Sequence, residues 1–358
     1  MRKLLKHLNT ILLGLFITSL FYLIVDPQEP IIKNNIDKIE GIIFDLRLNM
    51  TLPDVPRTSE HNIFIVDIDE KALKEVGRWP WSRMVVAELV EKLMDAGVVV
   101  VGFDVIFAEP ELNPVDKVLA AGGLADASPE YIAALRAELD ADAKMAQTIA
   151  DYDVVLGALF QDEVEVNVGH LKDTPIVMLD PAAVRVQSMS FQGKVSNIDK
   201  LQNAAMGQGF FNSAPDNDGS IRRAALVIEH KGILYPSLAV ETARLYTLAE
   251  KVEVETTPLP YSDNIHTITA IKFGINRIPT DEWGRVLVPF RGGQKSFPYY
   301  SAADILYNRL DPELLEGGVA LVGTSAVGIA DLRETAVGLQ YPGVEVHANL
   351  VSGIIEDR

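Results

Sequence analysis

Hydrophobic residues along this chain alternate between short continuous runs and helical spacing. The first strand-like run covers residues 63–68, and a second run, rich in β-branched residues, covers 98–107. Between them, residues 82–95 carry apolar side chains at helical spacing, with Ser82 as the expected N-cap and Gly97 just past the end. A strand, a helix and a further strand in this order predict a right-handed parallel crossover.

The remainder of the chain continues this alternation. Residues 208–212 and 221–229, with Asp218-Gly219 between them, predict a β-hairpin. Residues 161–206 show weak periodicity and predict irregular strands and loops. Other strands are predicted at 154–160, 268–273, 285–290 and 319–322, and helices from Ser128 to about Asp151 and at 236–248, 301–310 and 347–355. We therefore expect an α/β fold, a three-layer sandwich with a mostly parallel central sheet.

The N-terminus carries an apolar run from Ile11 to Val25, preceded by three basic residues. Extended back to Leu8, the run approaches the roughly 30 Å of a bilayer core. A cleaved signal peptide is the alternative, but residues 26–30 lack a small-x-small cleavage pattern. The basic flank predicts a short cytoplasmic start, so residues 1–26 are expected to be a transmembrane anchor with all that follows outside.

Residues 27–52 predict an amphipathic juxtamembrane helix. Its apolar positions are four and three residues apart, at Ile32, Ile36, Ile39, Ile43, Leu46 and Met50. We call them the isoleucine seam. The seam is too short for a long coiled coil, so it either packs against its own domain or forms a homodimer that carries strain toward the membrane. Residues 53–358 are then expected to form one extracytoplasmic domain.

Composition narrows the classes of function. Of 358 residues, 48% are hydrophobic, which is ample for a large core. A formal net charge of −18 makes nucleic acid an unsuitable partner, because phosphate binding needs clustered Lys and Arg. The lack of cysteine excludes disulfides and thiolate chemistry. Metalloprotease, hydrolase and kinase signatures are also missing from the sequence.

Three aspartates mark the expected carboxyl ends of neighbouring strands. Asp67 and Asp69 project to the same face, and Asp104 follows the next core strand. Together they could hold Mg²⁺ or Ca²⁺, or accept hydrogen bonds from the amines or hydroxyls of a ligand. The alternative is that they cap the following helix or turn.

The block 78–83 contains two of the three tryptophans in the chain. Trp79 and Trp81 could clamp a flat or cationic ligand, or they could pin a long loop onto the sheet. In the second case Arg78 or Arg83 would pair with one of the strand-end aspartates.

Two further segments contain candidate ligands. Asp216 and Asp218 are spaced like the opening of a calcium loop, but the third acid and the distal Glu of an EF-hand are missing, so a hairpin turn is the alternative. Arg222 and Arg223 should point to opposite faces of the next strand, so only one can face the core. The glycine-flanked stretch 323–328 could turn its amides toward an anion, or could serve close backbone packing.

Four separated blocks of the chain resemble the CHASE type 2 family, the extracytoplasmic sensory domains of bacterial cyclases and kinases. The blocks lie within residues 63–109, 207–223, 300–331 and 342–349. The third contains Thr324 and Asp331, which we add, with Arg222, to the expected ligand-binding residues.

The resemblance implies a sensory receptor anchored in the bacterial inner membrane, with the bulk of the chain in the periplasm. Its stimulus would be an unknown small molecule or protein. Relatives commonly continue into a class III adenylate or guanylate cyclase, and sometimes into a histidine kinase or diguanylate cyclase. We expect the sensor half of a class III adenylate cyclase. The other hypotheses are a metal-dependent envelope phosphoesterase, for which no base is evident, and a purely structural dimerisation module.

Overall fold

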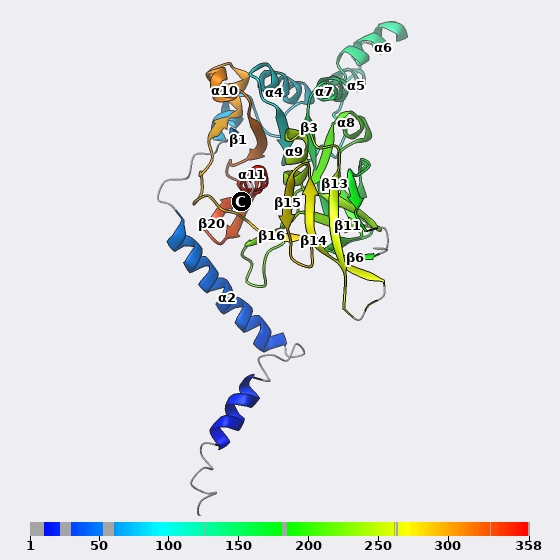
Figure 1. Cartoon of the computed structure of the whole chain (residues 1–358). Helices are drawn as coiled ribbons and strands as arrows, with labels where there is room; N and C mark the ends of the chain where they lie inside the picture. Colours follow the sequence, from blue (N-terminus) through cyan, green and yellow to red (C-terminus); the bar gives the residue numbers. More distant parts are fainter. Residues whose placement is uncertain are drawn as a thin grey trace, which may run out of the picture.

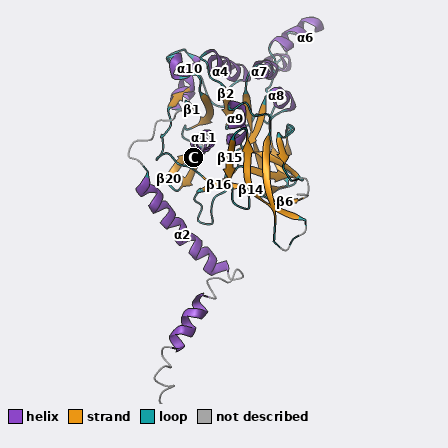
Figure 2. Ribbon diagram, viewed as in Figure 1, coloured by secondary structure: helices purple, strands orange, loops and turns teal. Residues whose placement is uncertain are grey.

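The computed structural model describes residues 11–21, 30–52, 61–124, 126–180, 185–260, 262, 264–329 and 331–356. It shows a mixed α/β body from which helix α2 (Pro30–Thr51) projects (Figure 1). Helices and strands alternate through the body, and the strands gather in two regions (Figure 2).

The central sheet is mostly parallel and joins strands that are far apart in sequence. β1 (Ile63–Ile68) lies between β17 (Tyr299–Ser301) and β18 (Val319–Thr324). β18 pairs with β2 (Val100–Phe103), and β2 with β3 (Val154–Gln161). Beyond β3 come β9 (Gly207–Phe210), which is parallel to it, and β8 (Gly193–Val195), which is antiparallel and pairs with β4 (Asn167–Val168). The β1–α4–β2 order is thus the predicted parallel crossover, with β18 inserted between the two strands.

Helices cover both faces of this sheet. Phe64 and Val66 of β1 face one hydrophobic core, and Ile63 and Ile65 face the other. The first core is covered by α3 (Glu70–Glu75), α4 (Arg83–Asp95), α7 (Ala141–Ala150), α8 (Asp199–Ala204) and α10 (Ala302–Leu306). The second is covered by α9 (Leu238–Tyr246) and α11 (Gly343–Ile355). Because β1 is buried on both faces, apolar and polar residues do not alternate along it.

A second, more irregular set of strands lies beyond α9 and α11, and the pattern did not predict it as a layer. Its main sheet contains β5 (Ile176–Met178), β6 (Arg185–Gln187), β13 (Val252–Pro258), β14 (Ile265–Phe273) and β15 (Asn276–Pro279). Smaller pairings join β7 (Ser190–Phe191), β11 (Val227–His230) and β12 (Ile233–Pro236), β10 (Arg223–Ala225) with β16 (Arg285–Leu287), and β19 (Leu332–Thr335) with β20 (Gly338–Pro342). Apolar residues of β13 and β14 belong to the second core, so this sheet adds a layer to the predicted three.

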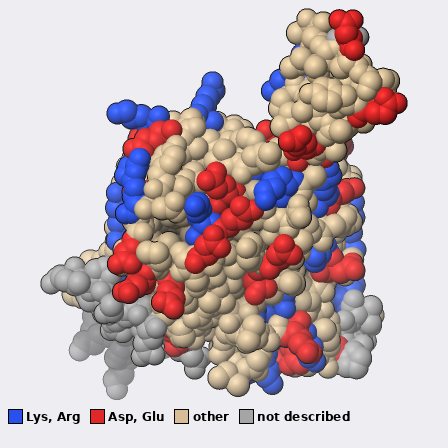
Figure 3. All heavy atoms as spheres, turned by 90° about the horizontal axis from the view of Figure 1, so that it is seen from above, with Lys and Arg blue, Asp and Glu red and all other residues tan. Residues whose placement is uncertain are grey.

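The short helices α5 (Pro114–Ala120) and α6 (Pro129–Glu138) stand out at one end of the body (Figure 1). Ser128 caps α6 as predicted, but the helix ends at Glu138 and α7 follows as a separate helix. A 3₁₀ turn covers Pro312–Leu314. Seen from this end, acidic and basic side chains are interspersed (Figure 3), so the excess negative charge is not gathered over it.

The predicted hairpin over 208–229 is wrong. The turn itself forms at Asp218-Gly219, where Gly219 has φ of 91°, but β9 pairs in parallel with β3, and β10 pairs with β16. The reason is packing: a Cβ at Gly209 would lie 2.4 Å from the backbone of Leu238. The glycines of β9 are needed for contact with α9, which places this strand in the central sheet.

Residues 11 to 21 are helical, and their side chains are exposed. Among the described residues, the structure holds no helix whose length and apolar character suffice for a bilayer crossing. The apolar run that predicted the anchor continues to Val25, and residues 22–29 lie outside the described part of the chain.

Candidate functional site

The carboxyl end of β1 is occupied by contacts within the chain. The Asp67 carboxylate accepts hydrogen bonds from the backbone N–H of Ser325 at 3.0 Å and from its hydroxyl at 2.6 Å. Burial raises the pKa of Asp67, and these hydrogen bonds oppose the rise. The 323–328 turn does direct amides at an anion, but the anions are the protein's own carboxylates, because the amide of Val327 binds Glu70. Gly323 also permits close packing, since a Cβ there would lie 2.6 Å from Val344.

Asp69 takes the capping role that was the alternative to ligand binding. It is the N-cap of α3, and its carboxylate accepts the amide of Ala72 at 2.8 Å. The hydroxyl of Ser301 donates to the same oxygen at 2.8 Å. Asp69 therefore ties β1, α3 and the end of β17 together.

The two tryptophans pack on the protein and on each other. Their rings meet edge to face with centroids 5.4 Å apart, and Trp81 is 5% exposed. The indole N–H of Trp81 donates to the carbonyl of Gly77 at 2.7 Å. Both rings contact the first hydrophobic core. This geometry favours the interpretation that they pin the loop before α4.

Arg83 contacts none of the three strand-end aspartates. It lies 3.7 Å from Asp142, and its guanidinium stacks over Phe107 at 4.6 Å from the ring centroid. Its backbone amide donates to Glu111 at 2.6 Å. Arg78 is exposed. The pairing expected for these arginines is thus replaced by an Arg83 contact that fixes the loop between β2 and α5.

A second group of polar side chains lies beyond the ends of β2 and β18. Burial raises the pKa of Asp104 well above its ordinary value, and the nearby charge of Asp331 adds to this while Arg333 opposes it. Asp331 pairs with Arg333 at 2.8 Å. Thr324 donates to the carbonyl of Ile329 at 2.8 Å, inside the same loop. Asp104 therefore lies close enough to Asp331 and Arg333 to feel their charges.

His347 of α11 is buried beside this group. It is 9% exposed, its Nδ1 has no hydrogen-bond partner among the described residues, and burial, together with the charge of Arg333, lowers its pKa to about 4. Between that pKa and the ordinary value of 6.5, the unfolded chain binds more protons than the folded chain. The folded state therefore loses stability as the pH falls through this window.

We expect the free energy of unfolding to fall by about 2 kcal/mol between pH 7 and pH 5, and this fall to depend on His347. His347→Gln should flatten the decline in the free energy of unfolding between pH 7 and pH 5, measured by urea denaturation. His170 is exposed, so His170→Gln is the matched control and should leave the decline unchanged. A wild-type decline that persists in His347→Gln would contradict this account.

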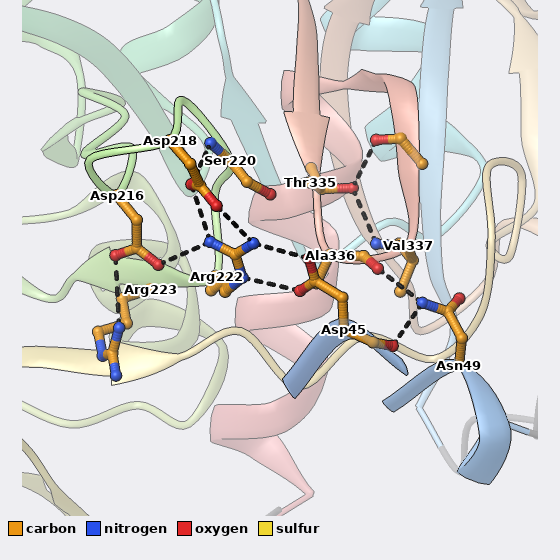
Figure 4. A network of polar contacts seen from close by, with 11 residues as sticks. Asp45, Asn49, Asp216, Asp218, Ser220, Arg222, Arg223, Thr335, Ala336 and Val337 are labelled. Carbon is orange, nitrogen blue, oxygen red and sulfur yellow. Dashed lines mark hydrogen bonds and ion pairs between the residues drawn. The ribbon is translucent and has the colours of Figure 1, made fainter. Parts of the chain in front are cut away.

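The most extensive polar network joins α2 to the body of the domain through Arg222 (Figure 4). The guanidinium donates to both oxygens of Asp45 at 2.7 Å, to both oxygens of Asp218 at 2.9 Å and to Asp216 at 3.2 Å. The Arg222 side chain is 5% exposed. These hydrogen bonds, those to Asp45 foremost, raise the pKa of Arg222, so its charge is permanent. A guanidinium bound to three carboxylates fixes both the 215–218 turn and the helix.

Arg223 points the other way, as expected for neighbours on a strand. Its side chain is 41% exposed and makes one contact of 3.3 Å with Asp216. Asp216 and Asp218, considered above as metal ligands, thus bind arginine in this structure. Within the described ranges, no three acidic or histidine side chains are grouped in a way that could hold a metal ion.

One face of α2 carries the contacts with the domain that the described side chains make. Phe44 and Leu48 pack against the second core, and Asn49 donates to the carbonyl of Ala336 at 2.8 Å. Gly41 lets the helix approach, because a Cβ there would lie 2.9 Å from Cζ of Arg222. With Asp45, these positions recur at helical spacing and form what we call the docking face of α2.

The isoleucine seam lies on a different face. Among its members, Ile39 is 58% exposed, Ile43 is 50% exposed and Met50 is 77% exposed. Leu46 is exposed as well, Ile36 is partly buried, and the side chain of Ile32 lies outside the described part. Since the docking face supplies the contacts with the chain's own domain, the seam is left open to another partner.

A hollow of about 500 Å³ lies between α2, the 215–218 turn and the β10–β16 pair. We call it the α2 hollow. It contains side chains of both charges, from α2 and from the domain, and it borders Arg222. It is therefore the place where a small molecule would contact the helix and the domain together.

Sequence reasoning missed Asp45 and Glu345. Asp45 lies between apolar positions of α2 and gave no motif. Glu345 stands in a block that resembled the CHASE type 2 family, but nothing in the pattern showed that it is fully buried and accepts hydrogen bonds from residues 295–299. In both cases the partner is far away in sequence.

Comparison with known proteins gives one match. The family model of the CHASE2 domain matches residues 15–358, which is nearly the whole chain. No curated protein and no solved structure matches the chain.

Proposed function

We propose that this chain, which belongs to the CHASE2 domain family, relays a stimulus from its α/β body through α2. CHASE2 domains are extracellular sensory domains of signalling proteins. The observation that carries the proposal is the Arg222–Asp45 contact, because it makes the position of α2 depend on the geometry of the 215–218 turn. A change in that turn would move the helix.

We further propose the segment order that the sequence predicts. Residues 1–26 would anchor the chain in the bacterial inner membrane, residues 27–52 would form the juxtamembrane helix, and residues 53–358 would form the periplasmic domain. The support is the basic flank before the apolar run and the outward projection of α2 (Figure 1). The output would be a class III adenylate cyclase, with a histidine kinase or diguanylate cyclase as the alternatives, and cyclic AMP formation by the complete gene product would distinguish them.

We propose that the isoleucine seam binds the seam of a second copy. The support is that this face is apolar and exposed while the opposite face is docked. Exposed apolar side chains in a row at helical spacing are suited to helix pairing. In a parallel pair, a displacement of each α2 would be transmitted across the dimer toward the membrane.

Ile39→Asp and Ile43→Asp are expected to convert a dimer into a monomer without unfolding the domain, because each places a charge in the seam and removes no contact with the body. Sedimentation of the detergent-solubilised chain, with its melting temperature as a second measurement, checks this. Leu339→Asp, at a 75% exposed site on β20, is the control. A wild-type chain that sediments as a monomer would end both the dimer proposal and this route of relay.

A further inference from the structure

The domain wall of the α2 hollow has a net positive charge, because Arg222, Arg223 and Arg285 outnumber Asp216 and Asp218. Arg223 and Arg285 stand on the paired strands β10 and β16, where Arg223 is opposite Leu287 and Ala225 is opposite Arg285. The two arginines are therefore diagonal neighbours on one face, within reach of the same ligand group. Among the described residues each makes a single carboxylate contact, Arg223 with Asp216 and Arg285 with Asp281, so most of the N–H groups of each guanidinium have no carboxylate partner there.

The helix wall of the hollow has a net negative charge, because the carboxylates of Asp37 and Glu40 outnumber the ammonium group of Lys38. Asp37 and Glu40 line it from α2, one turn apart on the same side of the helix. Neither takes part in an ion pair among the described residues, whereas the third acid of this part of α2, Asp45, is held by Arg222. The two walls thus present opposite net charges across a space of about 500 Å³, the size of a small-molecule site.

From this arrangement we propose that the α2 hollow binds a small zwitterion that carries a carboxylate and an ammonium group, such as a dipeptide. The carboxylate binds the Arg223–Arg285 pair and the ammonium binds Asp37 and Glu40. Phe44 and Leu287 supply apolar surface for the body of the ligand. A dianion would be repelled by the helix wall and a dication by the domain wall, which makes the zwitterion the matched class.

This inference rests on the proposed sensory function and adds a ligand class to it. A zwitterion in the hollow bridges α2 and the domain next to the Arg222 network. Binding would therefore hold the N-terminal half of α2 closer to β10 and β16, and release would free it. The ligand would act on the helix directly, without a change in the central sheet.

The test is isothermal titration of the whole detergent-solubilised chain with a free dipeptide, its N-acetylated form and its C-terminal amide. We expect the free dipeptide to bind and each blocked form to bind at least about tenfold more weakly, because each loses a charge-assisted contact. Arg285→Gln and Glu40→Gln should weaken binding of the free dipeptide by a similar factor. Arg277→Gln, an exposed arginine on β15 that pairs with Glu255, is the control and should change nothing.

Equal binding of the free and blocked forms, or no saturable heat from any of them with a folded chain, would overturn the inference. A different result would contradict the proposed function: sedimentation of the wild-type chain as a monomer. If the seam variants still dissociate a dimer while the dipeptides give no heat, only the ligand class is wrong.

Discussion

Arg222→Gln is expected to lower the free energy of unfolding by about 3 kcal/mol. The substitution removes the cation from a site where three carboxylates converge, and leaves Asp45, Asp216 and Asp218 to repel one another. Removing one partner of a buried ion pair costs about 3 to 5 kcal/mol. We expect a cost at the lower end of this range, because the three carboxylates are 22% to 27% exposed and are therefore still partly solvated by water.

Urea denaturation measures this effect, and Arg223→Gln provides the matched control. Arg223 is the neighbouring residue and contacts the same acidic turn, but its side chain is 41% exposed and its contact with Asp216 is 3.3 Å long. Its loss should cost less than about 1 kcal/mol, as for surface pairs. Equal effects of the two substitutions would mean that the network contributes nothing beyond general surface charge.

Glu345→Gln is expected to destabilise the domain by about 2 to 4 kcal/mol. The Glu345 side chain is fully buried in the first turn of α11. One carboxyl oxygen accepts the amide and the hydroxyl of Ser296, at 2.7 and 2.9 Å, and the other accepts the amide of Lys295 and the hydroxyl of Tyr299, at 2.9 and 2.8 Å. An amide NH₂ cannot accept, so at least one buried donor would face another donor, at a cost of about 1 to 3 kcal/mol plus the lost hydrogen bonds.

Thermal denaturation of Glu345→Gln checks this expectation, with Glu334→Gln as the control. Glu334 is an exposed acid on β19 whose side chain makes no hydrogen bond among the described residues. The melting temperature of Glu334→Gln should therefore stay within about 1 °C of that of the wild-type protein. An unchanged melting temperature in Glu345→Gln would show that the four contacts do not stabilise the junction of α11 with the 295–299 segment.

The pattern of apolar residues was sufficient for four strands of the central sheet, β1, β2, β3 and β18, but not for its other strands or for the layer beyond it. Long buried runs such as 63–68 and 319–322 predicted β1 and β18, because a strand covered on both faces leaves a continuous apolar signature. The strands between 161 and 206 are short and partly exposed, and their pairing depends on distant partners. The hairpin error has the same origin, since a tight turn does not determine which strands its flanks pair with.

The candidate site was predicted in parts. The strand-end aspartates were found, but their roles depend on Ser325, Ala72 and Ser301, which no local pattern connects to them. The isoleucine seam identified α2 and its apolar face, whereas the docking face, built on Gly41 and Asp45, was not distinguishable from an ordinary polar face. The sequence predicted that only one of Arg222 and Arg223 would face the core, but it did not show which, because the partner of Arg222 on α2 lies 177 residues away.

The central claim is that Arg222 sets the position of α2 relative to the sensory domain. The chain contains no cysteine, so two spin labels can be placed by single substitutions, Lys38→Cys on α2 and Glu334→Cys on β19, both at exposed positions. Pulsed electron–electron double resonance then measures the distance between them in detergent, with the labelled chain diluted in an excess of unlabelled chain so that distances between two copies do not contribute. The account predicts one narrow distance distribution in the wild-type background and a broad, shifted distribution with Arg222→Gln. The same narrow distribution in both would contradict it.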